Sequence, residues 1–509
     1  MSSKHKFLHI MRTMFTTGAA YAVNYGITLV LTPYITDTVG TEAYGFVSLA
    51  KQFAQYAVII TTALNTYAAR YIGISYHHGD KKEANTYFSS VFWGDVILAS
   101  VTLTGAVWLI FFLEHFIRIP GEIVADVKLL FLFAFLNLWV TTVFSAFGCA
   151  AYIEDKLDIT GIFKTISHMT NAAILVLAYV LFPAKVFYVG IGMTAASLVV
   201  ALSDLRITKK FTPELWPRRT DFSLAAVKRL VMEGCWASFN SVGELLNNGL
   251  DLIICNQMLS SLAMGQIAIA KTMNTIVQSL ILIVDQAFFP IFLKSYANHK
   301  KEKLLGELKI SMKISGFLAN AAFAGFVSLG LAYYRLWIPG QDIPLVYELT
   351  VISILACIPS GAVHPLYHIY TLTVKKAFPC LVTIAGGFFN VIGMYVLIKF
   401  FGMGAFAVIW TTVIVMAVIN FITNPLYMAH VLKVPLGTFY PDIIRNALSC
   451  MALTAVFKWI SCFYMPSSWL TLIICILIYL CIGMPIHLVI VCNKKQWKIL
   501  YGIVKKKME

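Results

Sequence analysis

The sequence predicts an all-α integral membrane protein with about fourteen transmembrane helices, and three observations lead to this class. Of the 509 residues, 59% are hydrophobic and only 12% are charged, which is about half the charged share of an average soluble domain. Apolar runs of about twenty residues recur along the whole chain, and each can cross a hydrocarbon layer ~30 Å thick. Lysine and arginine collect in alternate connections between these runs. A chain with this pattern crosses the membrane many times.

The apolar runs give the expected position of each span, with ends defined to within several residues. We expect spans near 13–36, 43–72, 87–113, 127–153, 158–182, 184–205, 227–257, 263–293, 307–334, 346–373, 378–399, 403–430, 441–463 and 468–492.

The lysines and arginines behind the net charge of +15 are distributed as the expected topology requires. Of the 39 lysines and arginines, 31 fall in the connections on one side, five fall on the other side, and three lie within spans. Because cytoplasmic connections are enriched in lysine and arginine, both termini are expected in the cytoplasm. The positive charge is therefore explained without a nucleic-acid partner, and none is expected.

The ten cysteines are scattered, mostly within apolar runs, and none shows C-x-x-C spacing. This arrangement indicates small core residues and gives no reason to expect a metal or a cofactor. His364 and His368 are spaced i, i+4, but Pro365 intervenes and no third ligand is evident, which favours a structural role for both. The sequence also lacks a phosphate-binding G-x-x-x-x-G-K-[ST] motif and any recognisable nucleophile with its base, so we do not expect an enzyme.

An internal repeat relates two halves of the chain at an offset of 220 residues. The stretch Glu42–Lys51 corresponds to Leu262–Lys271, with alanine, glycine and lysine recurring at matching positions. The same offset carries Ser75-Tyr76 onto Ser295-Tyr296 without a gap. A match of this length indicates duplication of a larger unit.

The repeat predicts two lobes of six spans followed by two unmatched spans. We place the N-lobe at 1–205, a cytoplasmic linker at 206–229, the C-lobe at 227–430, and spans 13 and 14 with a basic cytoplasmic tail at 431–509. Because six is an even number, the two copies share one orientation in the membrane. They are expected to be related by a pseudo-twofold axis along the membrane normal.

Polar residues form stripes on three of the expected spans. A charged side chain at the bilayer centre costs at least ~2.5–3.5 kcal/mol, and such residues usually face an internal cavity. At 100° per residue, each stripe stays on one side of its helix. The stripes include Lys51, Gln55 and Asn65 on span 2, Asn240, Glu244, Asn247 and Asp251 on span 7, and Lys271, Gln278 and Asp285 on span 8; span 1 adds Arg12 and Asn24.

Two interpretations of these stripes are open. The polar groups could satisfy one another, Lys271 with Glu244 or Asp251, and Lys51 with Gln55. Three stripes on repeated elements favour a water-filled cavity between the lobes. Amides and hydroxyls beside isolated cations suit a ligand with an anionic head and a hydroxyl-rich body.

At this point the residues resemble a known superfamily. The Gly-x-x-x-Tyr-Gly entry to span 2 at Gly40–Gly45, its Arg70-Tyr71 exit and the matching stretch on span 8 look like the multidrug/oligosaccharidyl-lipid/polysaccharide exporters. Within that superfamily, the chain most resembles Wzx-type flippases of the polysaccharide-biosynthesis branch. The resemblance covers spans 1–12 and, loosely, spans 13–14.

The resemblance implies a flippase that moves undecaprenyl-diphosphate-linked oligosaccharide from the cytoplasmic to the outer leaflet by alternating access, for cell-surface polysaccharide such as O-antigen or lipopolysaccharide. It implies a bacterial cytoplasmic membrane location, and contacts with membrane lipid and with other polysaccharide-assembly proteins. By analogy with related flippases, Arg12, Lys51 and Lys271 would receive the diphosphate. Asn24, Gln55, Asn65, Asn240, Asn247 and Gln278 would line the cavity, and Glu244, Asp251 and Asp285 are candidates for ion coupling.

Two alternatives stay open at the level of sequence. A cation-coupled multidrug exporter of the same fold would use the same carboxylates, in a cavity more acidic and aromatic than basic. A membrane-embedded polysaccharide polymerase or ligase would usually carry a large outer loop, whereas the outer connections expected here are short.

Overall fold

The computed structural model describes residues 3–373 and 377–492, and the regular elements of those residues are all helical. The chain divides into two compact units, Met1–Ala268 and Ile269–Glu509. The division falls inside the long helix α12, which runs from Ser261 to Ala297.

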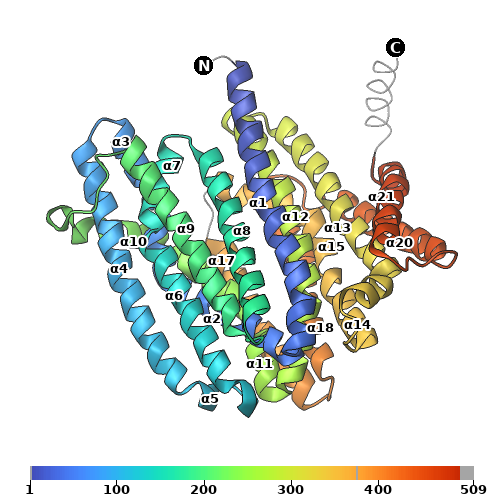
Figure 1. Ribbon diagram of the computed structural model, residues 1–509. Helices are drawn as coiled ribbons and strands as arrows, with labels where there is room; N and C mark the ends of the chain where they lie inside the picture. The colour runs from blue at the N-terminus through green and yellow to red at the C-terminus, as the bar shows by residue number, and fades with distance from the viewer. Residues whose placement is uncertain (1–2, 374–376, 493–509) are drawn as a thin grey trace. The chain divides into compact units, whose positions relative to one another are not determined.

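In the first unit, α8 packs on α1 and α9, and α6 packs on α9, α4 and α2 (Figure 1). Short helices interrupt or connect the long ones. The elements are α1 (Ser3–Thr38), α2 (Thr41–Asn65), α3 (Ala68–His77), α4 (Lys81–Phe111), α5 (Leu113–Phe116), η1 (Gly121–Ile123), α6 (Val124–Val143), η2 (Ser145–Gly148), α7 (Cys149–Ile153), α8 (Leu157–Leu181), α9 (Phe187–Phe211), η3 (Arg219–Asp221), α10 (Leu224–Asn248) and α11 (Asp251–Met258).

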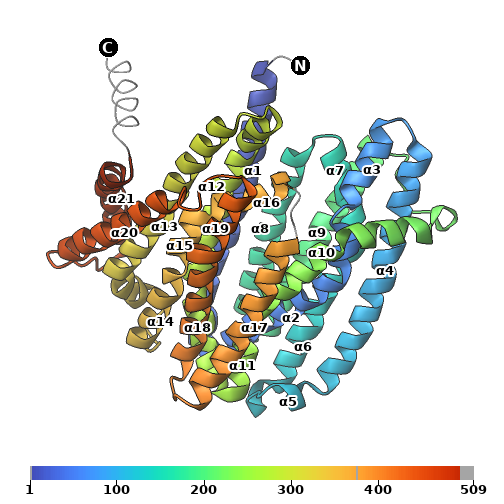
Figure 2. The ribbon, with the colours of Figure 1, turned by 180° about the vertical axis from the view of Figure 1, so that it is seen from behind.

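In the second unit, α13 contacts α14, α15, α20 and α21, and α18 contacts α14 and α17 (Figure 2). The two helices without a repeat counterpart, α20 and α21, therefore pack on α13. The elements after α12 are α13 (Lys301–Trp337), α14 (Ile343–Leu355), α15 (Cys357–Val363), η4 (His364–Tyr367), α16 (His368–Thr373), α17 (Ala377–Lys399), α18 (Ala405–Val418), the π-helix η5 (Ile419–Thr423), α19 (Asn424–Val431), α20 (Tyr440–Ser461) and α21 (Trp469–Val491).

Each of the fourteen predicted spans coincides with one helix or with a consecutive run of helices. Among the described residues, eleven such segments are long and apolar enough to cross a membrane by length and composition alone. The helices α1, α2 and α10 are not among these eleven. They are the helices on which the sequence places Arg12, Lys51 and Glu244. The predicted all-α membrane class is confirmed.

The repeat is visible in matching turns of the two units. The turn before α4 has Gly79 at φ 86°, and the turn before α13 has His299 at φ 54°. Both turns are closed by the same backbone hydrogen bonds, Asp80 N to Ser75 O and Lys300 N to Ser295 O, at 3.1 Å and 3.0 Å. Because positive φ strains a residue with a Cβ, the recurrence of this turn with histidine in place of glycine indicates a structural requirement.

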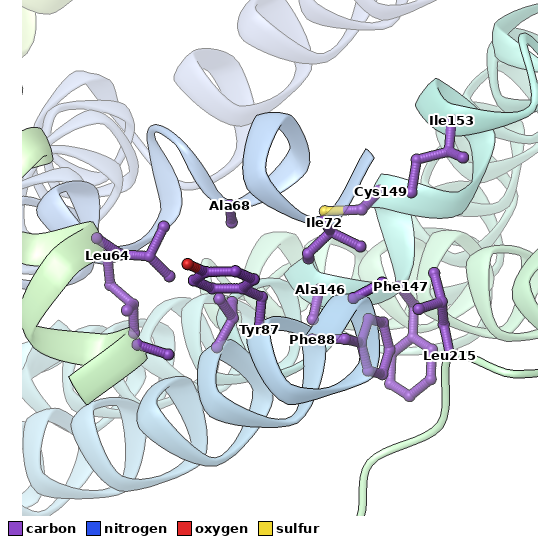
Figure 3. Packing of buried hydrophobic residues seen from close by; sticks show 14 residues of the cluster. Leu64, Ala68, Ile72, Tyr87, Phe88, Ala146, Phe147, Cys149, Ile153 and Leu215 are labelled. Carbon is purple, nitrogen blue, oxygen red and sulfur yellow. The ribbon is translucent and has the colours of Figure 1, made fainter. Parts of the chain in front are cut away.

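Two buried clusters also correspond at the offset of 220 residues. In the first unit, Phe88 lies against Phe147 with ring centroids 5.3 Å apart, and Leu215 packs nearby (Figure 3). The second unit builds a cluster from equivalent positions. The matched pairs are Ile72 and Phe292, Ala84 and Leu304, Phe88 and Leu308, Ala146 and Leu366, and Cys149 and Ile369.

The structure differs from the predicted continuous spans where a helix is interrupted inside a span. The predicted span 43–72 is broken between Asn65 and Ala68. Before the break, the hydroxyls of Thr61 and Thr62 donate to Val58 O at 3.0 Å and 2.9 Å, and the Asn65 amide donates to Thr61 O at 3.2 Å. Side chains that bond the preceding turn in this way compete with the backbone ladder and bend helices.

The predicted span 227–257 is broken as well, between α10 and α11. The interruption is Gly249-Leu250, and the Tyr56 hydroxyl of α2 donates to the Gly249 carbonyl. Glycine is the weakest helix former after proline, and a carbonyl that accepts from another helix helps to fix a helix end.

The predicted linker 206–229 is partly helical, because α9 continues to Phe211 and α10 begins at Leu224. The connection between them is fixed to α4. The Asn85 side chain accepts from Trp216 N at 2.8 Å and donates to Asp221 Oδ2 at 2.7 Å. Both Thr212 and Leu215 are fully buried. The lobe boundaries expected from the repeat stay a prediction.

Candidate functional site

The helices α2 and α10 pack closely inside the first unit. A Cβ at Gly234 of α10 would lie 2.7 Å from the carbonyl carbon of Ala63, so only glycine permits this approach. The Ser238 hydroxyl donates to Ile59 O at 3.1 Å. These contacts fix how the polar faces of α2 and α10 are turned.

The beginnings of α2 and α12 touch at two repeat-equivalent glycines. A Cβ added to Gly45 would lie 3.0 Å from the Gly265 Cα, and one added to Gly265 would lie 2.8 Å from the carbonyl carbon of Thr41. The repeated stretch is therefore a helix contact within the first unit. Lys51 and Lys271 each lie ten residues after the first residue of their helix, or ~15 Å along it.

On α2, Lys51 and Gln55 are exposed. Among the residues whose side chains the structure describes, no carboxylate forms a salt bridge with the Lys51 ammonium. The suggested pairing of Lys51 with Gln55 is not seen as a hydrogen bond among these residues either. The Lys51 side chain is therefore exposed and without a carboxylate partner among the described side chains, and its role in binding stays a prediction.

The stripe predicted on span 7 separates into two parts. The Asn240 amide donates to Glu244 Oε1 at 2.8 Å, and Glu244 is exposed. Asn247 and Asp251 are each only 1% exposed, and the Asn247 amide donates to Gly243 O at 2.8 Å. The helix break at Gly249 lies between these two buried residues. Their roles in binding and ion coupling stay predictions.

On α1, Asn24 is half-buried, and its backbone carbonyl accepts from Thr28 at 3.0 Å. Arg12 belongs to the same helix, but its side chain lies outside the described set. The predicted contribution of α1 to a binding site is therefore untested.

In the second unit, Lys271 is half-buried on α12 and its carbonyl accepts from Thr275 at 3.0 Å. One turn further, the Asn274 amide donates to Ser353 O at 2.5 Å. Gln278 hydrogen-bonds the Cys357 side chain of α15. Part of the predicted span-8 stripe is thus used to pack α12 against α14 and α15.

Two further predicted residues, Asn65 and Asp285, belong to buried polar clusters. Asn65 donates to Asp95 Oδ1 at 2.8 Å inside the first unit. Asp285 is 1% exposed and pairs with His364 inside the second unit. Both residues therefore have protein partners, whatever ligand reaches their surroundings.

Sequence reasoning misses Asp95 and the partner of His364. Asp95 is a lone carboxylate in an apolar run, and an ionisable residue within a span is a functional candidate on that ground alone. The spacing of His364 draws attention to His368 as its neighbour. Its actual partner, Asp285, is 79 residues away in the sequence, so local spacing gives no signal.

A family model described as "Polysaccharide biosynthesis protein" matches residues 10–296, which is more than half of the chain. The chain is 26% identical over 443 residues to the uncharacterized membrane protein EpsK of Bacillus subtilis (strain 168). That similarity covers 87% of this chain and 86% of EpsK.

Solved structures define the fold. The lipid II flippase MurJ in an inward closed conformation has a TM-score of 0.68 at 13% identity, over 95% of this chain and 98% of MurJ. An inward-facing multidrug resistance MATE family transporter of the MOP superfamily has a TM-score of 0.63 at 15% identity, over 81% of this chain and 95% of that one. The chain therefore belongs to the polysaccharide biosynthesis protein family and has the fold of the MOP superfamily transporters.

Proposed function

We propose that this protein is a flippase for polyprenyl-diphosphate-linked oligosaccharide, which it moves from the cytoplasmic to the outer leaflet by alternating access. The family assignment supports a role in polysaccharide biosynthesis. One protein of the same fold is named a lipid II flippase, and that name supports a lipid-linked substrate for this chain. The substrate joins an anionic diphosphate, a hydroxyl-rich glycan and a lipid tail.

The observation that carries the proposal is Lys51. It lies ~15 Å along α2, is exposed, and has no salt bridge to a carboxylate whose side chain the structure describes. A cation within a membrane span is costly, and an anion that visits the site lowers that cost. Lysine serves as a point-charge contact for phosphate. The repeat supplies Lys271 at the equivalent position of α12.

The surrounding polar groups fit the remainder of the substrate. Gln55 is exposed one turn after Lys51, and the exposed Glu244 is held by Asn240. Amide groups can donate to and accept from sugar hydroxyls. Arg12 would add a third cation from α1, and Asn24 a further amide.

A cation-coupled multidrug exporter is the second candidate, and the accessible Glu244 favours it. A cationic drug would pair with that carboxylate, whereas it would be repelled by Lys51. The transporter fold offers no support for the polymerase or ligase alternative. The two transport candidates differ in the charge of the substrate, and this difference makes them separable.

The experiment uses the full-length protein in liposomes. One arm measures the movement of undecaprenyl diphosphate carrying a fluorescently labelled N-acetylhexosamine between leaflets, by accessibility to an external quencher. The other arm measures uptake of a lipophilic cationic dye. The proposal expects protein-dependent movement of the diphosphate lipid and none of the dye. Dye transport without movement of the diphosphate lipid would contradict the flippase proposal and favour the multidrug exporter.

We also propose that both termini lie in the cytoplasm of a bacterial cell and that the protein resides in the cytoplasmic membrane. The distribution of lysine and arginine supports this orientation.

A further inference from the structure

The connection between α9 and α10 lies against the side of α4. The Ser89 hydroxyl oxygen accepts from Arg218 N at 3.1 Å, and the Ser90 hydroxyl oxygen accepts from Ser223 N at 2.9 Å. Asn85, one turn earlier on α4, also bonds this connection, as described above. The connection projects beyond α4 at the edge of the first unit (Figure 1, Figure 2). The α4 side chains therefore determine where its exposed side chains lie.

The length of α4 places this contact at the boundary between hydrocarbon and lipid headgroups. Its 31 residues are ~46 Å long, whereas a hydrocarbon layer is ~30 Å thick. The far end of the helix, Phe111, is still apolar and 73% exposed, so the excess length falls at the Lys81 end. Ser89 and Ser90 lie ~12–14 Å from Lys81 along the helix. The connection is therefore fixed to α4 at the level of the headgroups.

One face of α4 is apolar and exposed, and a residue of the connection lies at its end. Ile97 and Val101 are 55% and 67% exposed, as expected for a helix face that meets lipid. Trp93 is one turn before Ile97, about 40° away around the helix, and belongs to the same face. The Arg219 guanidinium lies over the Trp93 ring, 5.0 Å from its centroid. Arg219 is therefore positioned where the lipid-facing side of α4 reaches the headgroups.

The acids of the connection bond other groups, and its arginines form no ion pair. Glu214 pairs with the first residue of α4, and Asp221 accepts from the Asn85 amide at 2.7 Å. Arg218 and Arg219 are both exposed, and neither forms a salt bridge with a carboxylate of the described residues. A general enrichment of basic residues on this side does not require arginines that stay unpaired beside acids. The two guanidinium groups are available to an anion.

Exposed apolar side chains accompany these arginines. Trp216 is 42% exposed, Phe222 is 38% exposed, and Leu224 at the beginning of α10 is 72% exposed. Basic residues beside tryptophan, phenylalanine and leucine are typical of segments that lie in the membrane interface and attract anionic lipids. A soluble acidic partner would account for the arginines, but not for apolar side chains exposed at the level of the headgroups.

We propose that Arg218 and Arg219 bind the phosphate of an anionic phospholipid whose acyl chains lie along the exposed face of α4. A guanidinium group can pair with two phosphate oxygens at once. A lipid with a net negative headgroup, such as phosphatidylglycerol, is preferred over phosphatidylcholine, because the choline cation is repelled by the second arginine. This site is separate from the transport site, and the proposal does not depend on the flippase function.

A fluorophore on a cysteine at the exposed Thr220 reports on this site directly. The full-length protein, with its exposed Cys462 and Cys481 replaced, is placed in phosphatidylcholine liposomes. These contain an equal small share of either spin-labelled phosphatidylglycerol or spin-labelled phosphatidylcholine. The phosphatidylglycerol should quench the fluorophore more strongly. Arg218→Gln/Arg219→Gln should lower the ratio of the two apparent affinities by about thirtyfold, because each basic residue contributes about a fivefold preference.

A matched control removes the same charge elsewhere. Lys82→Gln/Lys300→Gln replaces two exposed lysines at the beginnings of α4 and α13, and it should keep the preference for phosphatidylglycerol. Arg218→Lys/Arg219→Lys should keep part of the preference, because the charge remains while the two-oxygen contact is lost. This variant also separates a lost ligand contact from a lost fold.

Three results would overturn the proposal. If neither lipid quenched the fluorophore, the connection would lie away from the membrane. Equal quenching by both lipids would leave the arginines to a soluble acidic partner. An equal loss of preference in the control and in Arg218→Gln/Arg219→Gln would reduce the effect to general attraction between a basic protein and an anionic membrane. Because no step measures transport, these results do not depend on whether the flippase proposal holds.

Discussion

Gly265→Ala should separate α2 from α12 at the contact between the repeated stretches. The new Cβ would stand 2.8 Å from the carbonyl carbon of Thr41, whereas ordinary contacts begin near 3.4 Å. The carbonyl oxygen of Thr41 would be closer still, so the helices must move apart by at least about 0.6 Å, the difference between these two distances. Because the obstacle is backbone, it cannot rotate away as a flexible side chain would.

The expected cost is at the upper end of the ~1–3 kcal/mol typical of overpacking. Replacing glycine by alanine inside a helix returns ~1 kcal/mol, so the net destabilisation is ~2 kcal/mol. Gly105→Ala is the matched control, because Gly105 lies inside α4 and the methyl group added there would have nothing within 4 Å. That control should gain ~1 kcal/mol, which separates the two variants by ~3 kcal/mol.

The assay is thermal unfolding of the purified proteins in one detergent at one heating rate. Gly265→Ala should unfold at a lower temperature than the wild type, and Gly105→Ala at an equal or higher one. If Gly265→Ala matched Gly105→Ala, the close approach of α2 and α12 would be refuted. The displacement also moves the helices that carry Lys51 and Lys271. The rate at which the labelled undecaprenyl-diphosphate lipid (the probe) moves between leaflets should therefore fall in Gly265→Ala and not in Gly105→Ala.

Three further predictions concern the first unit and the topology. Asp95→Leu should cost ~1–3 kcal/mol for each polar group that it leaves unpaired, while Asp95→Asn should cost less, as measured by thermal unfolding. The Lys81 ammonium hydrogen-bonds Glu214 and holds the pKa of that carboxyl below its usual range. The contact of the connection 212–223 with α4 should therefore be stable at neutral pH and should weaken as the pH falls through the Glu214 pKa. Glu214→Gln should speed hydrogen exchange in this connection at pH 7, and the variant should not differ from the wild type in acid. The topology is tested in a protein whose exposed Cys462 and Cys481 have been replaced. In intact cells, a cysteine at the exposed Thr220 should resist an impermeant thiol reagent, and a cysteine at the exposed Glu122 should react with it. The reverse pattern would contradict the predicted orientation.

The fold was predictable because its main signals are local or periodic. Each of the fourteen predicted spans coincides with a described helix or with a run of described helices. The match of Gly45 and Lys51 with Gly265 and Lys271 predicts a duplication. The equivalent turns at Gly79 and His299 agree with that offset. The breaks after Asn65 and Asn248 were not predicted, because they depend on hydrogen bonds within and between helices that apolar periodicity does not report.

The candidate site was predictable in part. Helical periodicity predicts which residues share one face of a helix, but it cannot tell a face that meets solvent from one that meets another helix. Lys51 and Glu244 are exposed, whereas Asn247 and Asp251 on the same predicted stripe as Glu244 are buried. The partnership of Asp285 with His364 depends on tertiary packing between distant segments, so only coordinates could show it.

The most direct measurement of the central claim is the initial rate of probe movement in Lys51→Gln, Lys271→Gln and the double variant, each compared with Lys→Arg at the same position. A hydrogen bond to a charged group contributes ~1.5–3 kcal/mol, so each Gln variant should raise the probe concentration needed for half-maximal rate by about tenfold or more. The double variant should lose more than either single one, and the Arg variants should retain more activity because charge is kept. Normal probe movement by Lys51→Gln/Lys271→Gln at matched protein amount would contradict the assignment of these lysines to the diphosphate.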